Sequence, residues 1–264
     1  MKLQISCQLD YEAYSSTPLI LMLRPRSNAG QWIIKEEYVL EPSVPITEYT
    51  DIYGNLCQRI LSPVGKFTVF TSSIVQTADF IDVAPGAEFV LIEDLPAEEL
   101  IYLLPSRYCE SDKMGNLAFQ IVGNAYPGYD QVELIRRWIH NNIRYQYGFS
   151  TVSTSAQDTA FAKIGVCRDF SHLGIALCRS LSIPARMVVG YLHELYPMDL
   201  HAWFEAFVGG RWYTFDATQP YPKGNRVVLA YGRDAADVAL ATQFGNIFLL
   251  GMQVNVSVAE EVNA

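Results

Sequence analysis

The segment GVCRD, residues 165–169, places a cysteine where an apolar helix pattern begins. Phe170 and the leucines after it recur at helical spacing, so Cys167 is expected in the first turn or cap of a helix. First-turn N–H groups have no intrahelical acceptor and the helix dipole is positive there, which stabilises a thiolate. Gly165 would let the chain turn sharply or let a substrate approach. Cys167 is therefore placed to act as a nucleophile, with its own N–H group available to a developing oxyanion.

The four other cysteines do not share this placement. Cys178 lies among the leucines of the same helix and is expected in the core, while Cys7 and Cys57 lie in a β region without a nearby histidine. Cys109 lies in a polar connector. Five cysteines without a C-x-x-C pair indicate reduced thiols rather than a disulfide framework.

A nucleophilic thiol needs a base, and imidazole titrates near neutral pH. Of the four histidines, His140 is expected on the polar face of a helix and His193 in a loop. His172 follows Cys167 on the same helix and cannot easily reach over the helix mouth. His201 differs, because it begins a strand pattern.

That strand pattern belongs to a predicted hairpin. Gly209 and Gly210 separate two alternating runs, which is the signal of a two-residue turn. With these glycines as the loop, Trp203 lies opposite Asp216, and His201 shares the face of Trp203. His201 and Asp216 are then diagonal neighbours, about 7–8 Å apart between backbones. A one-residue slip would move Asp216 to the other face.

Cys167, His201 and Asp216 together could form a nucleophile, a base and a carboxylate that orients the base. The alternative for His201 and Asp216 is an ordinary exposed cross-strand pair. A metal site made of Cys167, His172, Cys178 and His201 is disfavoured, because these residues lack the paired spacing of zinc ligands. We expect neither a metal nor a cofactor.

The elements around these residues indicate an α+β domain. A first helix is predicted over 129–145, and a second begins near Phe170 and ends before Pro184. Strands are predicted after them, at 185–192, 201–208, 211–217 and 252–258.

The chain before residue 98 has a different character. Lys2–Leu9 and parts of Gln31–Leu40 and Gly65–Thr71 alternate between apolar and polar residues, which predicts an antiparallel β-sandwich. It contains no histidine and no catalytic constellation. We therefore predict a β-sandwich domain over 1–97, acting as a scaffold or docking domain, and a catalytic core over 98–264.

Composition narrows the class of protein. Half of the 264 residues are hydrophobic and 18% are charged, which indicates a chain that forms a core. The net charge of −9, without a cluster of Lys and Arg, argues against a nucleic-acid partner. No segment has the length and hydrophobicity of a signal peptide or a membrane span, so no membrane association and a cytoplasmic location are expected.

Three segments, taken together, resemble the transglutaminase-like superfamily of thiol enzymes in its bacterial form. Residues 165–192 are similar to the nucleophile segment of that family, and 201–219 to its His-x-Trp-x-Glu and Trp-x-x-x-Asp-x-Thr segment. Residues 231–239 are similar to a tail common in bacterial members, and the N-terminal part resembles the β domain that precedes the core in those members.

The resemblance implies a papain-like fold with a Cys–His–Asp triad at Cys167, His201 and Asp216. It implies attack of a thiolate on a peptide or amide substrate, an acyl-enzyme and release by water or an amine. A second oxyanion donor should lie upstream, and Tyr145 is our candidate. Arg168 departs from the Gln or other polar residue expected there, and it either alters acyl-group preference or caps Asp169.

Hydrolysis of a peptide, isopeptide or amide bond is the leading prediction, which makes the protein a cysteine protease or amidase. One alternative is a true transglutaminase, which transfers the acyl group to an amine. Another is a binding module with an idle triad, although the three residues are intact. The substrate and the oligomeric state do not follow from the sequence.

Overall fold

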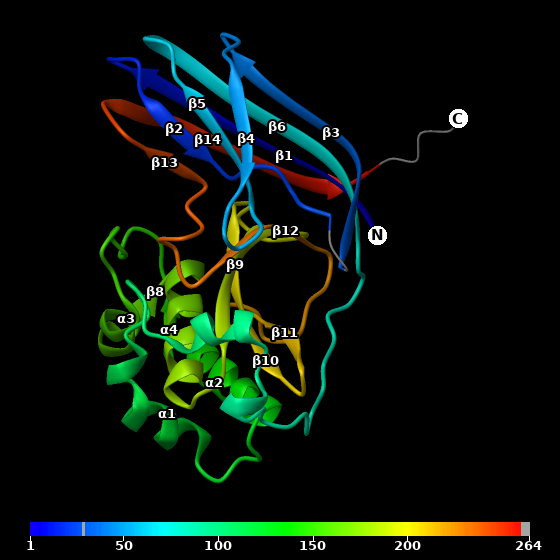
Figure 1. Ribbon diagram of the computed structural model, residues 1–264, viewed down its shortest axis with the longest axis vertical. Coiled ribbons are helices and arrows are strands. Elements are labelled where there is room, and N and C mark those ends of the chain that lie inside the picture. Colours follow the sequence, from blue (N-terminus) through cyan, green and yellow to red (C-terminus); the bar gives the residue numbers. More distant parts are fainter. Residues whose placement is uncertain (28–29, 260–264) are drawn as a thin grey trace.

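The structure is a computed structural model that describes residues 1–27 and 30–259. It has a two-layered β part and a mixed part that carries all the α-helices of the described residues (Figure 1). The β part contains β1 (Lys2–Ala13), β2 (Pro18–Leu21), β3 (Gln31–Glu41), β4 (Ile46–Thr50), β5 (Leu56–Leu61) and β6 (Gly65–Thr77). It is completed by β13 (Ala241–Gln243) and β14 (Ile247–Val258).

The strands of the β part form two antiparallel sheets, in the orders β14-β1-β6-β3 and β13-β2-β5-β4. Every second residue of β1 is buried, so one face of its sheet packs inward and the other faces outward. The two sheets lie one behind the other in Figure 1, as the sequence predicted for an antiparallel sandwich.

The C-terminal strands belong to these two sheets. β14 pairs antiparallel with β1, from Leu3 opposite Val258 to Ala13 opposite Ile247, and β13 pairs with β2. The sequence division at residue 97 assigned these strands to the catalytic core. Periodicity could not place them, because strand partners distant in sequence are not encoded in the local pattern. The boundary near residue 97 itself stays a prediction.

The mixed part contains a further antiparallel sheet, which we call the core sheet, in the order β11-β10-β9-β12. Its strands are β9 (Ala185–Leu192), β10 (His201–Val208), β11 (Arg211–Phe215) and β12 (Arg226–Gly232). Gly209 and Gly210 both have positive φ, and Val208 lies opposite Arg211. The predicted hairpin register is therefore confirmed.

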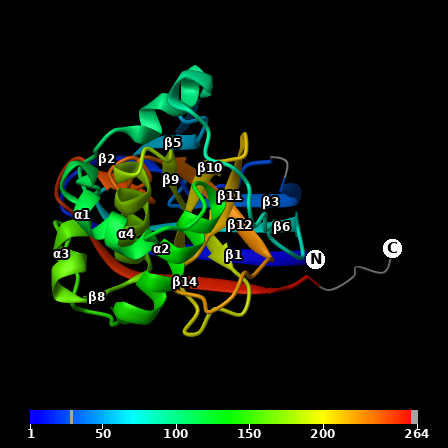
Figure 2. The same cartoon turned by 90° about the horizontal axis from the view of Figure 1, so that it is seen from below.

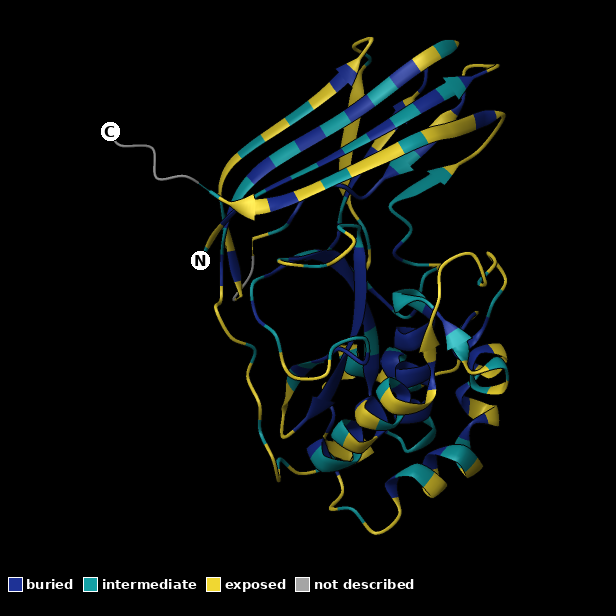
Figure 3. Cartoon of the chain, turned by 180° about the vertical axis from the view of Figure 1, so that it is seen from behind, coloured by how far each residue is buried: buried dark blue, intermediate teal, exposed yellow. Residues whose placement is uncertain are grey.

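The described residues of the mixed part form four α-helices: α1 (Gly115–Val122), α2 (Tyr129–Asn142), α3 (Ala156–Ala162) and α4 (Cys167–Ser180). α4 packs against β9 and β10, and α1, α2 and α3 pack around α4 (Figure 2). The exposed stripes of α1, α2 and α3 contrast with the nearly continuous burial of α4 (Figure 3). α2 and α4 were predicted, whereas α1 and α3 are too short to show a clear period.

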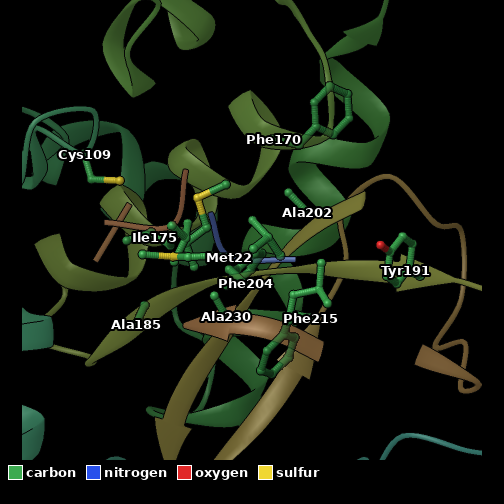
Figure 4. Close-up of a cluster of buried hydrophobic side chains, with 14 of the residues drawn as sticks. Met22, Cys109, Phe170, Ile175, Ala185, Tyr191, Ala202, Phe204, Phe215 and Ala230 are labelled. Carbon is green, nitrogen blue, oxygen red and sulfur yellow. The ribbon is translucent and has the colours of Figure 1, made fainter. Parts of the chain in front are cut away.

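A single cluster of buried apolar side chains joins the two parts of the molecule. Met22, from the segment after β2, lies in it with Ile175 of α4 and Phe204 of β10 (Figure 4). The connector between the parts contains the 3-10 helices η1 (Ile92–Asp94) and η2 (Ala97–Leu103). A third short one, η3 (Ser111–Lys113), precedes α1.

Within residues 1–27 and 30–259, the helices are too short or too polar to cross a lipid bilayer. The cytoplasmic location stays a prediction from the sequence.

Gly190 lies at a close approach between β9 and β12 of the core sheet. It lies opposite His201 in the pairing of β9 with β10, and a Cβ atom there would overlap the Val227 carbonyl oxygen of β12. We expect Gly190→Ala to lower the free energy of unfolding by about 1–3 kcal/mol, because the strands must move apart. Denaturant unfolding measures this. Gly251→Ala is the control, since a Cβ atom at Gly251 meets no atom within 4 Å; equal loss in both variants would contradict the packing argument.

Candidate active site

Cys167 is the first residue of α4, as the sequence predicted. The carboxylate of Asp169 accepts a hydrogen bond of 2.9 Å from the N–H group of Val166, and in this way it caps the N-terminus of α4. A Cβ atom at Gly165 would lie 2.8 Å from the Asp169 Cβ atom. Gly165 is therefore needed for the close approach of the buried Asp169 rather than for a turn with positive φ. The Cys167 side chain itself is partly exposed.

His201 and Asp216 lie together at the end of the hairpin. His201 Nε2 is 2.7 Å from Asp216 Oδ2, and both residues are buried. β11 ends at Phe215, so Asp216 leaves the strand and turns its carboxylate toward the imidazole. Because the carboxylate occupies Nε2, Nδ1 is the ring nitrogen left for the thiol of Cys167. The exposed cross-strand pair considered as an alternative does not fit this burial.

Further groups donate hydrogen bonds to both oxygens of the Asp216 carboxylate. Arg226 Nη2 donates to Asp216 Oδ2 at 2.8 Å, and the Thr218 hydroxyl and N–H groups donate to Oδ1 at 2.7 and 3.0 Å. Burial acts to raise the pKa of Asp216, but His201 and Arg226 hold that pKa well below its usual range. The carboxylate is therefore ionised at every pH at which the protein would work.

The charge of Asp216 also sets the protonation of His201. Burial acts to lower the pKa of His201, but the Asp216 carboxylate and contact with the Cys167 thiol group raise it to about 9. At neutral pH the imidazole therefore favours the protonated form when a thiolate is beside it. An imidazolium at this place would stabilise a thiolate on Cys167.

Tyr145 is held near Cys167 by a short pair of parallel strands. β7 (Arg144–Tyr145) pairs with β8 (Ile164–Gly165), which precedes α4 directly. The Tyr145 phenol interacts with both the thiol group and the backbone of Cys167, and burial together with the charge of that thiol group raises its pKa well above its ordinary value. The hydroxyl therefore keeps its proton and is available as a donor beside the nucleophile.

Arg168 is turned away from the thiol. Its Nη2 donates to the Thr151 carbonyl at 2.6 Å and to Asp169 Oδ1 at 3.0 Å. Of the two roles that the sequence left open for Arg168, this geometry favours the support of Asp169.

The other histidines and cysteines have structural surroundings. His140 Nδ1 lies 3.0 Å from the Ala217 carbonyl, and His193 lies in the turn after β9. Cys7, Cys57, Cys109 and Cys178 are buried, and burial raises the pKa of each of their thiols. In the part of the chain that the structure describes, no three His, Cys, Asp or Glu side chains gather to hold a metal ion.

His172 holds the segment that follows β12. Its Nε2 accepts the N–H group of Ala235 at 3.1 Å, and its ring stacks on Tyr108 with centroids 5.0 Å apart. Burial, assisted by the charge of Arg168, lowers the pKa of His172 to about 3. The ring is therefore neutral in the folded protein and acts as an acceptor.

This neutral histidine should make stability fall in acid. Below pH ~6.5 the unfolded chain protonates His172 but the folded chain does not. The contribution of His172 to the free energy of unfolding is therefore complete above that pH and is lost as the pH falls toward 3. The expected slope from this group is roughly 1.4 kcal/mol per pH unit at most. Denaturant unfolding between pH 6.5 and 4 measures it. His172→Gln should show a flatter dependence than the wild type, and equal slopes would contradict this role.

Sequence reasoning missed Arg226, Gly190 and the capping role of Asp169. Arg226 begins β12 and stacks 4.9 Å from the Trp203 ring centroid while it bonds Asp216. The sequence did contain one signal for Arg226, because it is an arginine next to an apolar strand segment, and a buried charge needs a partner.

A larger cavity of about 550 Å³ lies among residues of the core sheet and the connector, away from Cys167. In it Arg186 pairs with Glu205 at 2.7 Å and lies between the rings of Trp212 and Tyr231, at 4.1 and 4.0 Å. These contacts give Arg186 a structural role, and Cys167 is not among the residues that line this cavity.

The chain is similar to known proteins over the region that carries this site. Residues 115–217, which include Cys167, His201 and Asp216, match the model of the transglutaminase-like superfamily core. The chain is 29% identical over 234 residues to the uncharacterized protein ML0607 of Mycobacterium leprae, and the match covers 82% of each chain.

A solved structure is similar over the whole fold. It is described as "a Putative Cysteine Protease from Cytophaga hutchinsonii", and it is 38% identical with a TM-score of 0.92. The match covers 100% of this chain and 92% of that chain, so the β part and the mixed part are both shared.

Proposed function

Because this chain belongs to the transglutaminase-like superfamily, we propose that it is a thiol-dependent acyl-transfer enzyme that hydrolyses a peptide, isopeptide or amide bond. Cys167 is the nucleophile, His201 the general base and acid, and Asp216 the group that orients the imidazole. The partner is a peptide or amide substrate, and the chemistry requires no cofactor.

One observation carries the proposal. His201 bonds the Asp216 carboxylate at 2.7 Å and, on its other side, contacts the Cys167 thiol group. Cys167 and His201 line the same open cavity of about 240 Å³. A base with a fixed tautomer therefore faces a nucleophile at a place that a substrate can enter.

The first half of the reaction follows from these positions. The Cys167 thiolate attacks the carbonyl carbon, a C–S bond forms, and the carbonyl oxygen becomes an oxyanion. The Cys167 N–H group and the Tyr145 hydroxyl, which interact with each other beside the thiol, are the two donors proposed for that oxyanion. The imidazolium of His201 then gives its proton to the leaving nitrogen, the C–N bond breaks and an amine departs.

The second half reverses the roles of the same groups. Neutral His201 takes a proton from water, the hydroxide attacks the thioester carbon and the C–S bond breaks. The acid product leaves and the thiolate–imidazolium pair is restored. An amine in place of water would complete a transglutaminase reaction at the same site.

The acyl-enzyme provides the direct test. p-Nitrophenyl acetate, rapid acid quenching and mass spectrometry of peptides should give one acetyl group on Cys167 and none on the four buried cysteines. Fluorogenic peptide amides, with and without cadaverine, then separate release by water from transfer to an amine. Failure of Cys167 to acylate at any pH between 6 and 9 would sink the proposal and favour a binding module.

Tyr145 is expected to act in the transition state. Tyr145→Phe removes the hydroxyl while it keeps the ring against Phe170, at 5.7 Å between centroids. We expect kcat to fall by about 10²-fold with little change in KM, because the lost donor serves the oxyanion. Steady-state kinetics on the ester measure both constants. A change confined to KM would show that Tyr145 only binds substrate.

A further inference from the structure

The cavity beside the thiol has a marked chemical bias. Apart from Cys167 and His201, its only ionisable lining residue is Arg168. The remaining lining is alanine or larger apolar side chains, of which the largest are Met187, Val189, Leu200, Val238 and Leu240. Met187 and Val189 come from β9, and Val238 and Leu240 from the segment between β12 and β13.

Apart from the Cys167–His201 pair, the one charged residue of this lining is already neutralised. The Arg168 guanidinium forms an ion pair with Asp169 and donates to the Thr151 carbonyl. A charged substrate group held against the apolar walls, away from the Cys167–His201 pair, would therefore lose water and gain no partner, which is costly.

The outer wall, residues 235–240, is held from both parts of the molecule. Ala235 donates to the neutral His172 of α4 at 3.1 Å, and the Leu240 carbonyl accepts the N–H group of Met22 at 2.9 Å. Between them, the Tyr53 hydroxyl donates to Asp237 at 2.8 Å. A wall tied at three places is formed before substrate arrives, which suits a specificity pocket.

We propose that this cavity binds an uncharged aliphatic or aromatic side chain of the acyl donor, next to the carbonyl that Cys167 attacks. The substrate class is then peptides or amides with a large apolar residue on the acyl side of the cleaved bond. This inference rests on the function proposed above. The volume of about 240 Å³ admits a leucine or phenylalanine side chain.

A series of chloromethyl ketones tests the pocket without turnover. The Cys167 thiolate displaces chloride and forms a C–S bond with the methylene carbon, so the rate reports how each side chain is held beside the thiol. N-acetyl-leucyl, N-acetyl-alanyl and N-acetyl-aspartyl chloromethyl ketones would be compared, each divided by the rate of iodoacetamide, which has no side chain. Mass spectrometry of the Cys167 peptide gives the rates.

The leucyl reagent should react about 10–100-fold faster than the alanyl reagent, as burial of the added aliphatic carbons predicts. The aspartyl reagent should be no faster than the alanyl one. Equal normalised rates for the leucyl and aspartyl reagents would overturn the proposal. If the leucyl preference is found but peptide amides are not cleaved, the pocket stands and the proposed hydrolysis fails.

Two matched variants locate the effect. Ala239 lines the cavity and is only partly buried, whereas Ala236 lies on the same segment, is exposed and does not line it. With each rate divided by the iodoacetamide rate of the same variant, Ala239→Leu should abolish the leucyl advantage, while Ala236→Leu should behave like the wild type. A leucyl advantage that survives in Ala239→Leu, or is lost equally in both variants, would contradict this assignment.

Discussion

A Cys167→Ala variant is expected to lose catalysed hydrolysis by roughly 10⁴-fold or more while it keeps its fold. The thiol is the only nucleophile at the mouth of the cavity among the described residues, and the four remaining cysteines are buried with raised pKa values. Its side chain is partly exposed at the first turn of α4, so its removal leaves little unfilled space. Ester and peptide-amide kinetics, with thermal unfolding in parallel, measure the two effects.

His201→Ala serves as the matched partner of that experiment. It keeps the thiol but removes the group that stabilises a thiolate beside it. Iodoacetamide should label Cys167 more slowly near pH 7 in this variant than in the wild type, and the four buried thiols serve as internal references. Unchanged labelling would mean that the thiol and the imidazole do not act together, whatever the activity of Cys167→Ala.

An Asp216→Ala variant is expected to lose both activity and stability. The carboxylate lies between the His201 imidazole and the Arg226 guanidinium, all within the protein interior. Removal leaves two buried cationic groups without their anion, and Arg226 Nη1 already has no hydrogen-bond partner among the residues described. The free energy of unfolding should fall by about 3–5 kcal/mol at pH 7, and activity by about 10³–10⁴-fold.

A double variant separates the loss of stability from the loss of activity. In Asp216→Ala with Arg226→Met the stranded guanidinium is gone, so part of the lost stability should return while activity stays low. Denaturant unfolding of the two single variants and the double variant gives the coupling free energy. Additive losses would contradict the argument that the buried guanidinium is the main cause of the destabilisation.

The raised pKa of His201 adds a pH dependence to this ion pair. Its contribution to stability is complete below pH ~6.5 and is lost as the pH rises through about 9, because the folded protein holds the proton longer than the unfolded chain. The stability difference between wild type and Asp216→Ala should therefore shrink at high pH.

The hairpin illustrates what local sequence can predict. The Gly209–Gly210 pair defines the turn, the turn defines the register, and the register places His201 and Asp216 on one side. The helix that begins at Cys167 was equally readable, because its apolar stripe and its preceding glycine are contiguous in the chain.

Other features depend on contacts that no local pattern records. Arg226 reaches Asp216 from a different strand, and its direction follows from the stacking on Trp203. The apolar wall at 235–240 reads as part of a loop in sequence, and only its ties to His172 and Met22 make it a wall. The pairing of β14 with β1 joins segments separated by nearly all of the described chain.

That last pairing has a consequence for how the protein matures during synthesis. β1 leaves the ribosome early and can pair with β6, but its other edge stays open until β14 has been made. The wall at 235–240 likewise gains its tie to Met22 only after residue 240 has been made and β13 can join β2. Cys167 is translated before residues 235–240, so the cavity beside its thiol lacks this wall while the chain is growing.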